Sequence, residues 1–247
     1  MPGWARAGSI ALALFVAWLT ANALYQVLRK PAELFFPVRG ALNKTPAETW
    51  REYEPIFREH ATATVTPELL AALAQVEAAG NPLATPDWRL KLTTQPFAHP
   101  FSWYRPASSA VGMYQITDGT LAQAKGYCIH WHAVVEEGPW HDWRSCWFNA
   151  LYLRVVPSHA AEMTSAFLDR RVSEILQSHS GSATLEQRQD LAALVHLCGP
   201  GAGQRFVAAN FRLRPGQRCG EHDAAAYLAQ VKRMERVFAA LSAERSR

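Results

Sequence analysis

Glu77 is a carboxylate that stands where a predicted helix ends. Thr66 suits the N-cap of this helix, Pro67 its first position and Gly80 the residue just past its end. The helical period puts Glu77 on the apolar face, in the last turn, where the macrodipole is negative. Partial desolvation and the macrodipole both favour the protonated acid, which is the group that glycosidic bond cleavage requires. The alternative is an ordinary helix-end glutamate whose carboxylate bends out to solvent.

A second polar candidate, Gln115, lies in the run Gly112-Met113-Tyr114-Gln115-Ile116 before another predicted helix. Its amide can hydrogen-bond a sugar, but it can equally cap the helix that follows. Met113 in a turn can serve packing alone. Ser108 and Ser109, just upstream, can be turn formers before a glycine.

Two ordered motifs give these residues a family resemblance. The run from Glu77 to Pro82 (EAAGNP) resembles a motif that reads Glu-Ser followed by Asn-Pro, and Gly112-Met113-Tyr114-Gln115 resembles one that reads Gly-Leu-Met-Gln. Both belong to the lytic transglycosylase (SLT) domain of the lysozyme-like superfamily. A proteobacterial branch with this domain is similar over longer runs, so the resemblance covers most of the chain after about Pro46: Thr66–Ala84, Ser108–Ile129, Cys146–Met163 and His196–His222.

The chain also departs from the family pattern. Ala78 replaces the usual serine after the acidic residue. The third motif of the family reads Ala-Tyr-Asn before a glycine-rich stretch. At the equivalent place this chain has His196-Leu197-Cys198 instead. The tyrosine and asparagine that would help to hold the saccharide are therefore absent.

The resemblance implies a peptidoglycan lytic transglycosylase. The enzyme would cleave the β-1,4 bond between N-acetylmuramic acid and N-acetylglucosamine, leave a 1,6-anhydromuramoyl product and need no cofactor or metal. Glu77 would be the general acid and then the general base. Gln115 would bind the sugar, and the expected substrate-binding residues beside it are Met113, Tyr114, Ser108, Ser109 and Tyr104. Tyr104 belongs to the aromatic loop 86–106, our candidate for excluding water from the cleft.

Two other functions fit the same residues. A lysozyme-like hydrolase would need a second carboxylate, for which Asp87 in the aromatic loop is the candidate. A catalytically weak peptidoglycan-binding protein would account for the altered third motif. The net charge of +4 suits an acidic polymer or a membrane surface. The chain has no dense basic run or nucleic-acid motif, so we expect glycan strands, not nucleic acid, as the partner.

The N-terminus predicts export. Arg6 is the first charged residue before an apolar run, and Ala21-Asn22-Ala23 is a small-x-small cleavage pattern. The uncharged stretch from Ala7 to Leu28 is also long enough to cross a bilayer. We favour cleavage over an anchor and expect a monomeric periplasmic protein. The predicted parts are a signal peptide or anchor over 1–23, a linker over 24–45 and the transglycosylase domain over 46–247.

Four cysteines in an exported chain predict disulfides. Nearest-neighbour pairing, the simplest connectivity, would join Cys128 to Cys146 and Cys198 to Cys219. Zinc is the competing interpretation, because three histidines lie between the first two cysteines: His130, His132 and His141. The spacing does not match the usual zinc motifs, so metal is the lesser alternative.

Apolar periodicity predicts a mainly α fold, with one helical domain and at most a small β element. The resemblance implies that this domain is of the α+β lysozyme-like type and has a cleft. Between the helices we expect an irregular aromatic loop over 86–106. The expected helices lie at about 46–60, 67–79, 118–127, 146–156, 157–178, 185–197, 202–210 and 221–243.

Overall fold

The computed structural model describes residues 2–38, 40–90, 99–136, 138–142, 145–177 and 181–245. The described chain is mainly helical with small two-stranded sheets, as predicted. In order, the α-helices are α1 (Gly3–Arg29), α2 (Pro46–Glu59), α3 (Pro67–Ala78), α4 (Asp118–Ala124), α5 (Pro157–Gln177), α6 (Leu185–Cys198), α7 (Pro200–Ala208) and α8 (Ala224–Arg245).

Helix α3 forms the centre of the helical body. Its residues 69–74 are fully buried, which is the pattern of a helix covered on all sides. Helices α2 and α8 pack against it, and α8 also contacts α6. Trp50 and Phe57 of α2 point inward, and both rings lie in the core. The core therefore fixes α3 firmly up to the turn that carries Glu77.

The described residues form three antiparallel strand pairs: β1 (Trp88–Leu90) with β2 (Tyr104–Pro106), β3 (Tyr127–His130) with β4 (Ala133–Glu136), and β5 (Arg218–Cys219) with β6 (His222–Asp223). The first pair lies in the segment that we expected to be mostly irregular. It aligns Trp88 with Pro106 and Leu90 with Tyr104. Residues 91–98 of the same loop lie outside the described residues. The last pair delays the start of α8 from the expected residue 221 to Ala224.

Two other segments differ from expectation. The predicted helix over 146–156 is only a 3-10 turn, η2 (Trp147–Leu151). Cys146 is held by its disulfide at one end of this segment, and the Asn149 amide donates to the carbonyl of Tyr127 on β3, so the chain cannot wind regularly. The expected linker contains another 3-10 helix, η1 (Pro31–Val38), whose buried Glu33 accepts a hydrogen bond from Trp88.

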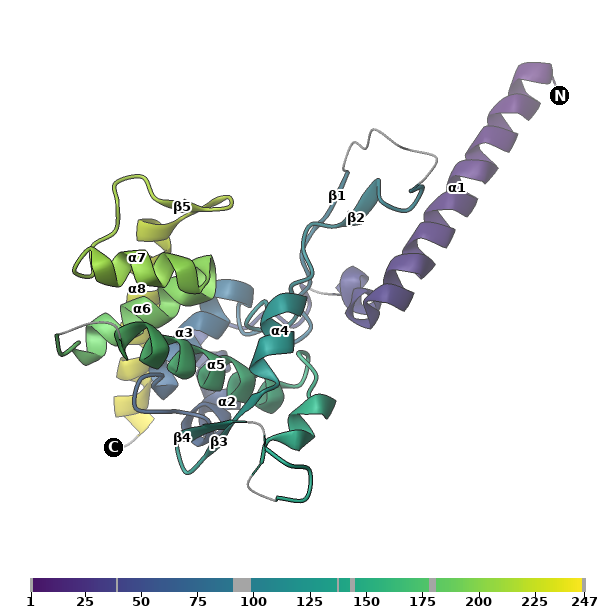
Figure 1. Cartoon of the computed structure of the whole chain (residues 1–247). Helices are drawn as coiled ribbons and strands as arrows, with labels where there is room; N and C mark the ends of the chain where they lie inside the picture. The colour runs from purple at the N-terminus through teal and green to yellow at the C-terminus, as the bar shows by residue number, and fades with distance from the viewer. Residues whose placement is uncertain are drawn as a thin grey trace.

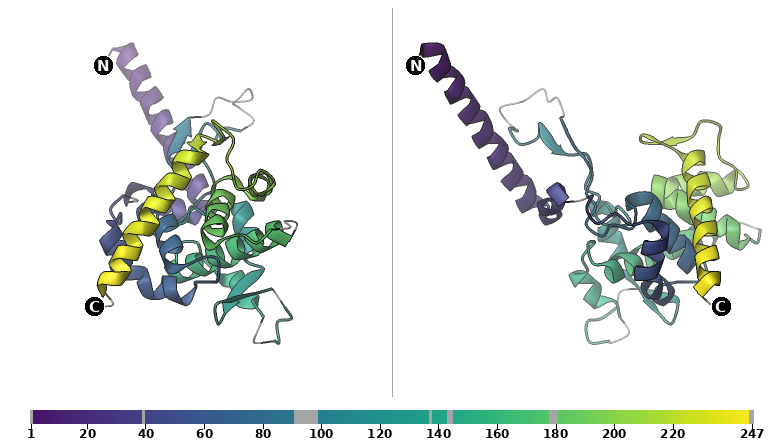
Figure 2. Two further views of the ribbon diagram at one scale, coloured as in Figure 1. Left: turned by 90° about the vertical axis from the view of Figure 1, so that its left-hand side faces the viewer. Right: turned by 180° about the vertical axis from the view of Figure 1, so that it is seen from behind.

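Helix α1 stands out from the helical body (Figure 1). The β1–β2 pair rises from the body beside the lower part of α1, and both further views repeat this arrangement (Figure 2). Helix α8 lies on the opposite side of the body from α1. The molecule thus has a helical body that carries Glu77 and an elongated apolar extension.

Candidate functional site

Glu77 lies in the last turn of α3, as the sequence predicts. The helix begins with the expected cap, in which the Thr66 hydroxyl accepts from the backbone N–H of Leu69. It ends at Ala79 and Gly80, which take left-handed backbone conformations with φ of 48° and 65°. A Cβ on Gly80 would lie 2.3 Å from Thr49 Oγ1 on α2, so only glycine fits this crossing. This tight stop holds Glu77 at the rim of the core.

Two side chains from other helices meet the Glu77 carboxylate. The Tyr227 hydroxyl on α8 donates to Glu77 Oε1 at 2.5 Å, and His196 Nε2 on α6 lies 3.6 Å from the same oxygen. Glu77 is 18% exposed and His196 11%, so the cluster is mostly buried but open to solvent on one side. Both contacts involve Oε1, which leaves Oε2 as the oxygen that can carry or exchange a proton.

Tyr227 is a permanent donor in this cluster. Burial raises its pKa well above the ordinary value, and the negative charge of Glu77 and the hydrogen bond to it act in the same direction. A tyrosine in this state keeps its proton throughout the accessible pH range. Tyr227 can therefore orient the carboxylate and stabilise its ionised form, but it does not act as a base.

The second motif is tied to the loop that follows Glu77. The backbone N–H of Gly112 donates to the Ala84 carbonyl at 2.8 Å, and Gln115 Nε2 donates to the same carbonyl at 3.2 Å and to the Gly112 carbonyl at 2.9 Å. Gly112 is required here, because a Cβ would lie 2.1 Å from the carbonyl oxygen of Arg154. The two motifs, separated in sequence, thus form one hydrogen-bonded unit.

Gln115 has an unusual backbone conformation for a residue that is not glycine. Its φ is 47°, in the left-handed region. Such conformations cost energy and concentrate at functional sites, so this one supports a special role for the residue. Its amide nitrogen, however, serves the local turn, which is the structural role that the sequence also allowed.

Met113 and Tyr114 do not line an open surface, in contrast to our expectation. Both side chains are fully buried in the core. The bridge between Val111 and Ile116 folds this segment into a tight turn that directs the intervening apolar residues inward. Burial raises the pKa of Tyr114 well above its ordinary value. Its hydroxyl makes no hydrogen bond within the described part of the chain.

The two serines serve local backbone structure. Ser108 Oγ accepts from the Ala110 N–H at 3.2 Å, and Ser109 Oγ accepts from the Asp118 N–H at 3.1 Å at the start of α4. Tyr104 is half-buried in β2, with its ring 5.2 Å from that of Trp88. The serine contacts agree with the turn-forming interpretation. The Tyr104 ring packs against the neighbouring strand of its own hairpin.

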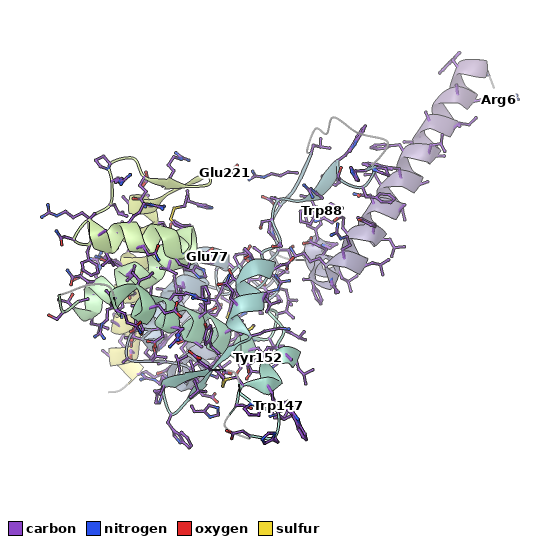
Figure 3. The ribbon with its side chains drawn as sticks, viewed as in Figure 1. Arg6, Glu77, Trp88, Trp147, Tyr152 and Glu221 are labelled. Atoms are coloured by element: carbon purple, nitrogen blue, oxygen red, sulfur yellow. A yellow bond between two sulfur atoms is a disulfide. The ribbon has the colours of Figure 1, made fainter. Side chains whose placement is uncertain are left out.

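His196 and Tyr227 are the site residues that the sequence analysis missed as functional. They lie 119 and 150 residues after Glu77 in sequence. His196 stands at the place of the family's third motif without matching it, and Tyr227 lies outside the three motifs. The available signal was this departure from the third motif, which puts a histidine two residues before a cysteine in the last turn of α6. The disulfide Cys198–Cys219 joins that turn to β5, shortly before α8 begins, and so fixes both helices around Glu77. Figure 3 shows Glu77 within the helical body, between the labelled Glu221 and Tyr152.

Both nearest-neighbour disulfides are present, which confirms the predicted pairing. With Cys128 and Cys146 oxidised, the zinc interpretation loses its thiolate ligands. Within the described ranges no group of three His, Cys, Asp or Glu side chains is arranged to hold a metal ion. His130 ends β3, whereas His132 lies in the following turn with φ of 63° and contacts the Ala61 carbonyl at 2.9 Å.

Asp87, the proposed second carboxylate of a hydrolase, is exposed just before β1. Its backbone carbonyl accepts from the Ala107 N–H, so the residue belongs to the base of the hairpin. The ionisable partners found at Glu77 are instead His196 and Tyr227. The local chemistry is therefore that of one carboxylate with a histidine and a tyrosine.

Comparison of the chain with protein-family models, with curated proteins and with solved structures finds no match.

Proposed function

We propose that the protein is a peptidoglycan lytic transglycosylase of the periplasm, with Glu77 as its sole general acid and base. The observation that carries the proposal is the mostly buried Glu77 carboxylate, which is held through Oε1 by Tyr227 and approached by His196. The disulfides and the apolar N-terminal helix suit an exported protein. The motifs at Glu77 and Gln115 also support the proposal, because they resemble two motifs of the lytic transglycosylase domain.

A single carboxylate can carry out the reaction if the substrate supplies the nucleophile. Protonated Glu77 gives its proton to the glycosidic oxygen, and the bond from that oxygen to C1 of the muramoyl residue breaks. The N-acetyl group of the same sugar stabilises the positive charge that develops at C1. The Glu77 carboxylate then takes the proton of the C6 hydroxyl while O6 bonds to C1. The anhydro ring closes, Glu77 is protonated again and no water is consumed.

Tyr227 and His196 have distinct roles in this cycle. The Tyr227 hydroxyl keeps the carboxylate in one orientation, so that Oε2 faces the leaving oxygen. His196 stabilises the ionised carboxylate between the two proton transfers, when the negative charge is greatest. These roles replace the saccharide-binding pair of the family's third motif with groups that act on the acid itself.

The test is digestion of purified sacculi by the full chain in detergent. Glu77→Gln should abolish release of soluble muropeptides, while the circular dichroism spectrum, both disulfides and sacculus binding are retained. Glu68→Gln is the matched control, because it makes the same change on the first turn of α3 and should remain active. The wild-type product should be lighter by one water than the hydrolytic product. Full activity of Glu77→Gln would reject the assignment, and a product that had gained water would point to a hydrolase.

A further inference from the structure

Helix α1 exposes an apolar surface that the other described residues do not cover. It is 27 residues long, and only 6% of its most apolar window is buried. Ile10, Leu14 and Phe15 are among the exposed side chains. The uncharged stretch from Ala7 to Leu28 measures about 33 Å at 1.5 Å per residue, close to the thickness of a bilayer core. Such a surface is suited to the hydrocarbon core of a lipid bilayer.

The lower half of the same helix has a stripe of polar donors. Trp18, Asn22, Gln26 and Lys30 are spaced by four residues, so they share one face. Each donates a side-chain hydrogen bond to a backbone carbonyl of the segment 100–110. The pairs are Trp18 to Pro100 at 3.2 Å, Asn22 to Tyr104 at 2.7 Å, Gln26 to Phe101 at 2.8 Å and Lys30 to Ala110 at 2.9 Å.

This contact is a packed interface and not a chance approach. Asn22 is completely buried and Gln26 is 8% exposed, and the ring of Tyr25 stacks on that of Phe101 with centroids 4.9 Å apart. Buried amides are costly unless they are hydrogen-bonded. The two amides and the two carbonyls therefore satisfy one another, which holds the β1–β2 pair against α1.

The docked hairpin bears directly on the Ala21-Asn22-Ala23 cleavage pattern. The middle residue of this pattern is covered by the hairpin, and the backbone continues as helix through Arg29. Cleavage after Ala23 would remove Trp18 and Asn22 and break half of the donor stripe. A leader that is discarded has no need of a matched interface with the mature domain.

The stripe also defines where the bilayer would lie. Trp4 and Asn22 are about 27 Å apart along the helix, so a bilayer core between them leaves Gln26 and Lys30 in the headgroup layer. Arg6 then lies close to the far edge of this core, where a long charged side chain can extend to the headgroups. Trp18 then lies near the boundary, where tryptophan is enriched. The exposed side chains of the neighbouring hairpin suit the same layer. Leu90 and Trp103 are apolar, while Arg105 faces a cavity of about 490 Å³ that Arg29 also lines.

We propose that α1 is a retained membrane anchor and that the β1–β2 pair, with residues 99–106, forms a collar on it in the headgroup layer of the bilayer. The partner is a phospholipid surface whose phosphates face Arg29 and Arg105. The collar sets the height and tilt of the helical body above the membrane. This proposal is independent of any reaction at Glu77.

The first test is the N-terminus of the mature protein. The full chain is expressed with its own N-terminal segment in a bacterial host, and the membrane fraction is washed with alkaline carbonate. Mass spectrometry should find the intact segment, and the protein should stay in the membrane. A mature chain that begins at Leu24 would overturn the proposal.

The second test is the position of the collar. Because all four native cysteines form disulfides, a fluorophore on Ser102→Cys reports from one place on the hairpin. In vesicles of phosphatidylethanolamine and phosphatidylglycerol, spin labels on the lipid headgroups should quench it. Asn22→Leu combined with Gln26→Leu should abolish this quenching although the anchor becomes more apolar. Thr20→Leu, which also makes the anchor more apolar but lies outside the stripe, should preserve it. Absence of quenching in the otherwise unaltered chain would overturn the collar.

Discussion

At the scale of single residues, Tyr227 and Tyr152 make the same kind of bond in different places. Tyr227 donates to Glu77, and Tyr152 donates to the buried Glu162 at 2.6 Å. Tyr227→Phe should lower the free energy of unfolding by about 1 kcal/mol, as expected for loss of one hydrogen bond. It should also reduce the rate of sacculus digestion, because the hydrogen bond that orients the Glu77 carboxylate is lost.

Tyr152→Phe is the control for that prediction. It should lower stability similarly while the rate of digestion remains unchanged, because Glu162 has no role in the proposed reaction. Equal effects of both variants on this rate would mean that Tyr227 acts only through the stability of the fold.

Glu235 makes the pH dependence of stability testable. Burial, followed by the negative charge of Asp190, raises its pKa to about 7, and Lys232 only partly opposes this. The folded state therefore binds a proton between about pH 4.5 and 7 that the unfolded state has lost, so stability falls as the pH rises through this window. Glu235→Gln should be more stable than wild type at pH 8 by on the order of 2 kcal/mol, and equal to it near pH 4.

Chemical denaturation at both pH values measures this difference. Glu186→Gln is a useful comparison, because Lys232 lowers the pKa of Glu186 by a hydrogen bond and by its charge. That variant should be slightly less stable than wild type at pH 8, opposite in sign to Glu235→Gln. A Glu235→Gln advantage that is the same at pH 4 and pH 8 would show that packing, not ionisation, causes it.

At the scale of elements, the two disulfides close loops of similar length but hold different parts of the fold together. Cys198–Cys219 spans 21 residues and Cys128–Cys146 spans 18. Replacing either pair by serines should cost about 3 kcal/mol in the chain-entropy model. Only the Cys198–Cys219 variant should also slow digestion at a temperature where both variants are folded, because His196 lies two residues from Cys198. Equal loss of activity in both would contradict a local role for this bridge.

The same elements show what could be predicted from the sequence. Helix α3 has a capping threonine, a proline at its start and a left-handed stop, so its bounds and the place of Glu77 followed from local rules. The 3-10 turn after Cys146 could not be predicted, since a disulfide and the Asn149 bond override its apolar pattern. Tyr227 could not be found either, because its contact with Glu77 joins residues 150 apart and depends on how α8 crosses α3.

At the scale of the whole molecule, the β1–β2 pair links the proposed membrane anchor α1 to the loop that precedes α8. The Tyr104 carbonyl of this pair accepts a hydrogen bond from Asn22 of α1. On the other side, Arg89 makes a bidentate ion pair with Glu221, with nitrogen–oxygen distances of 2.6 and 3.1 Å. Glu221 lies between β5 and β6, in the loop that the Cys198–Cys219 disulfide joins to the last turn of α6. Figure 3 shows the labelled Glu221 and Trp88 on the upper side of the molecule, above Glu77.

This ion pair should restrict the motion of the hairpin relative to the loop before α8 more than it contributes to the free energy of unfolding. Both side chains are exposed, at 53% and 73%, and exposed pairs contribute little to the free energy of unfolding. Arg89→Gln should therefore leave the thermal midpoint unchanged. It should broaden the distribution of distances between spin labels on Ser102→Cys and Ala225→Cys, which lie on the two sides of the pair, and high salt should broaden it similarly in wild type. Arg212→Gln, another exposed arginine of the C-terminal region, should change neither quantity. An unchanged distribution in Arg89→Gln would mean that the helical body alone fixes the loop, and that the hairpin and the site move independently.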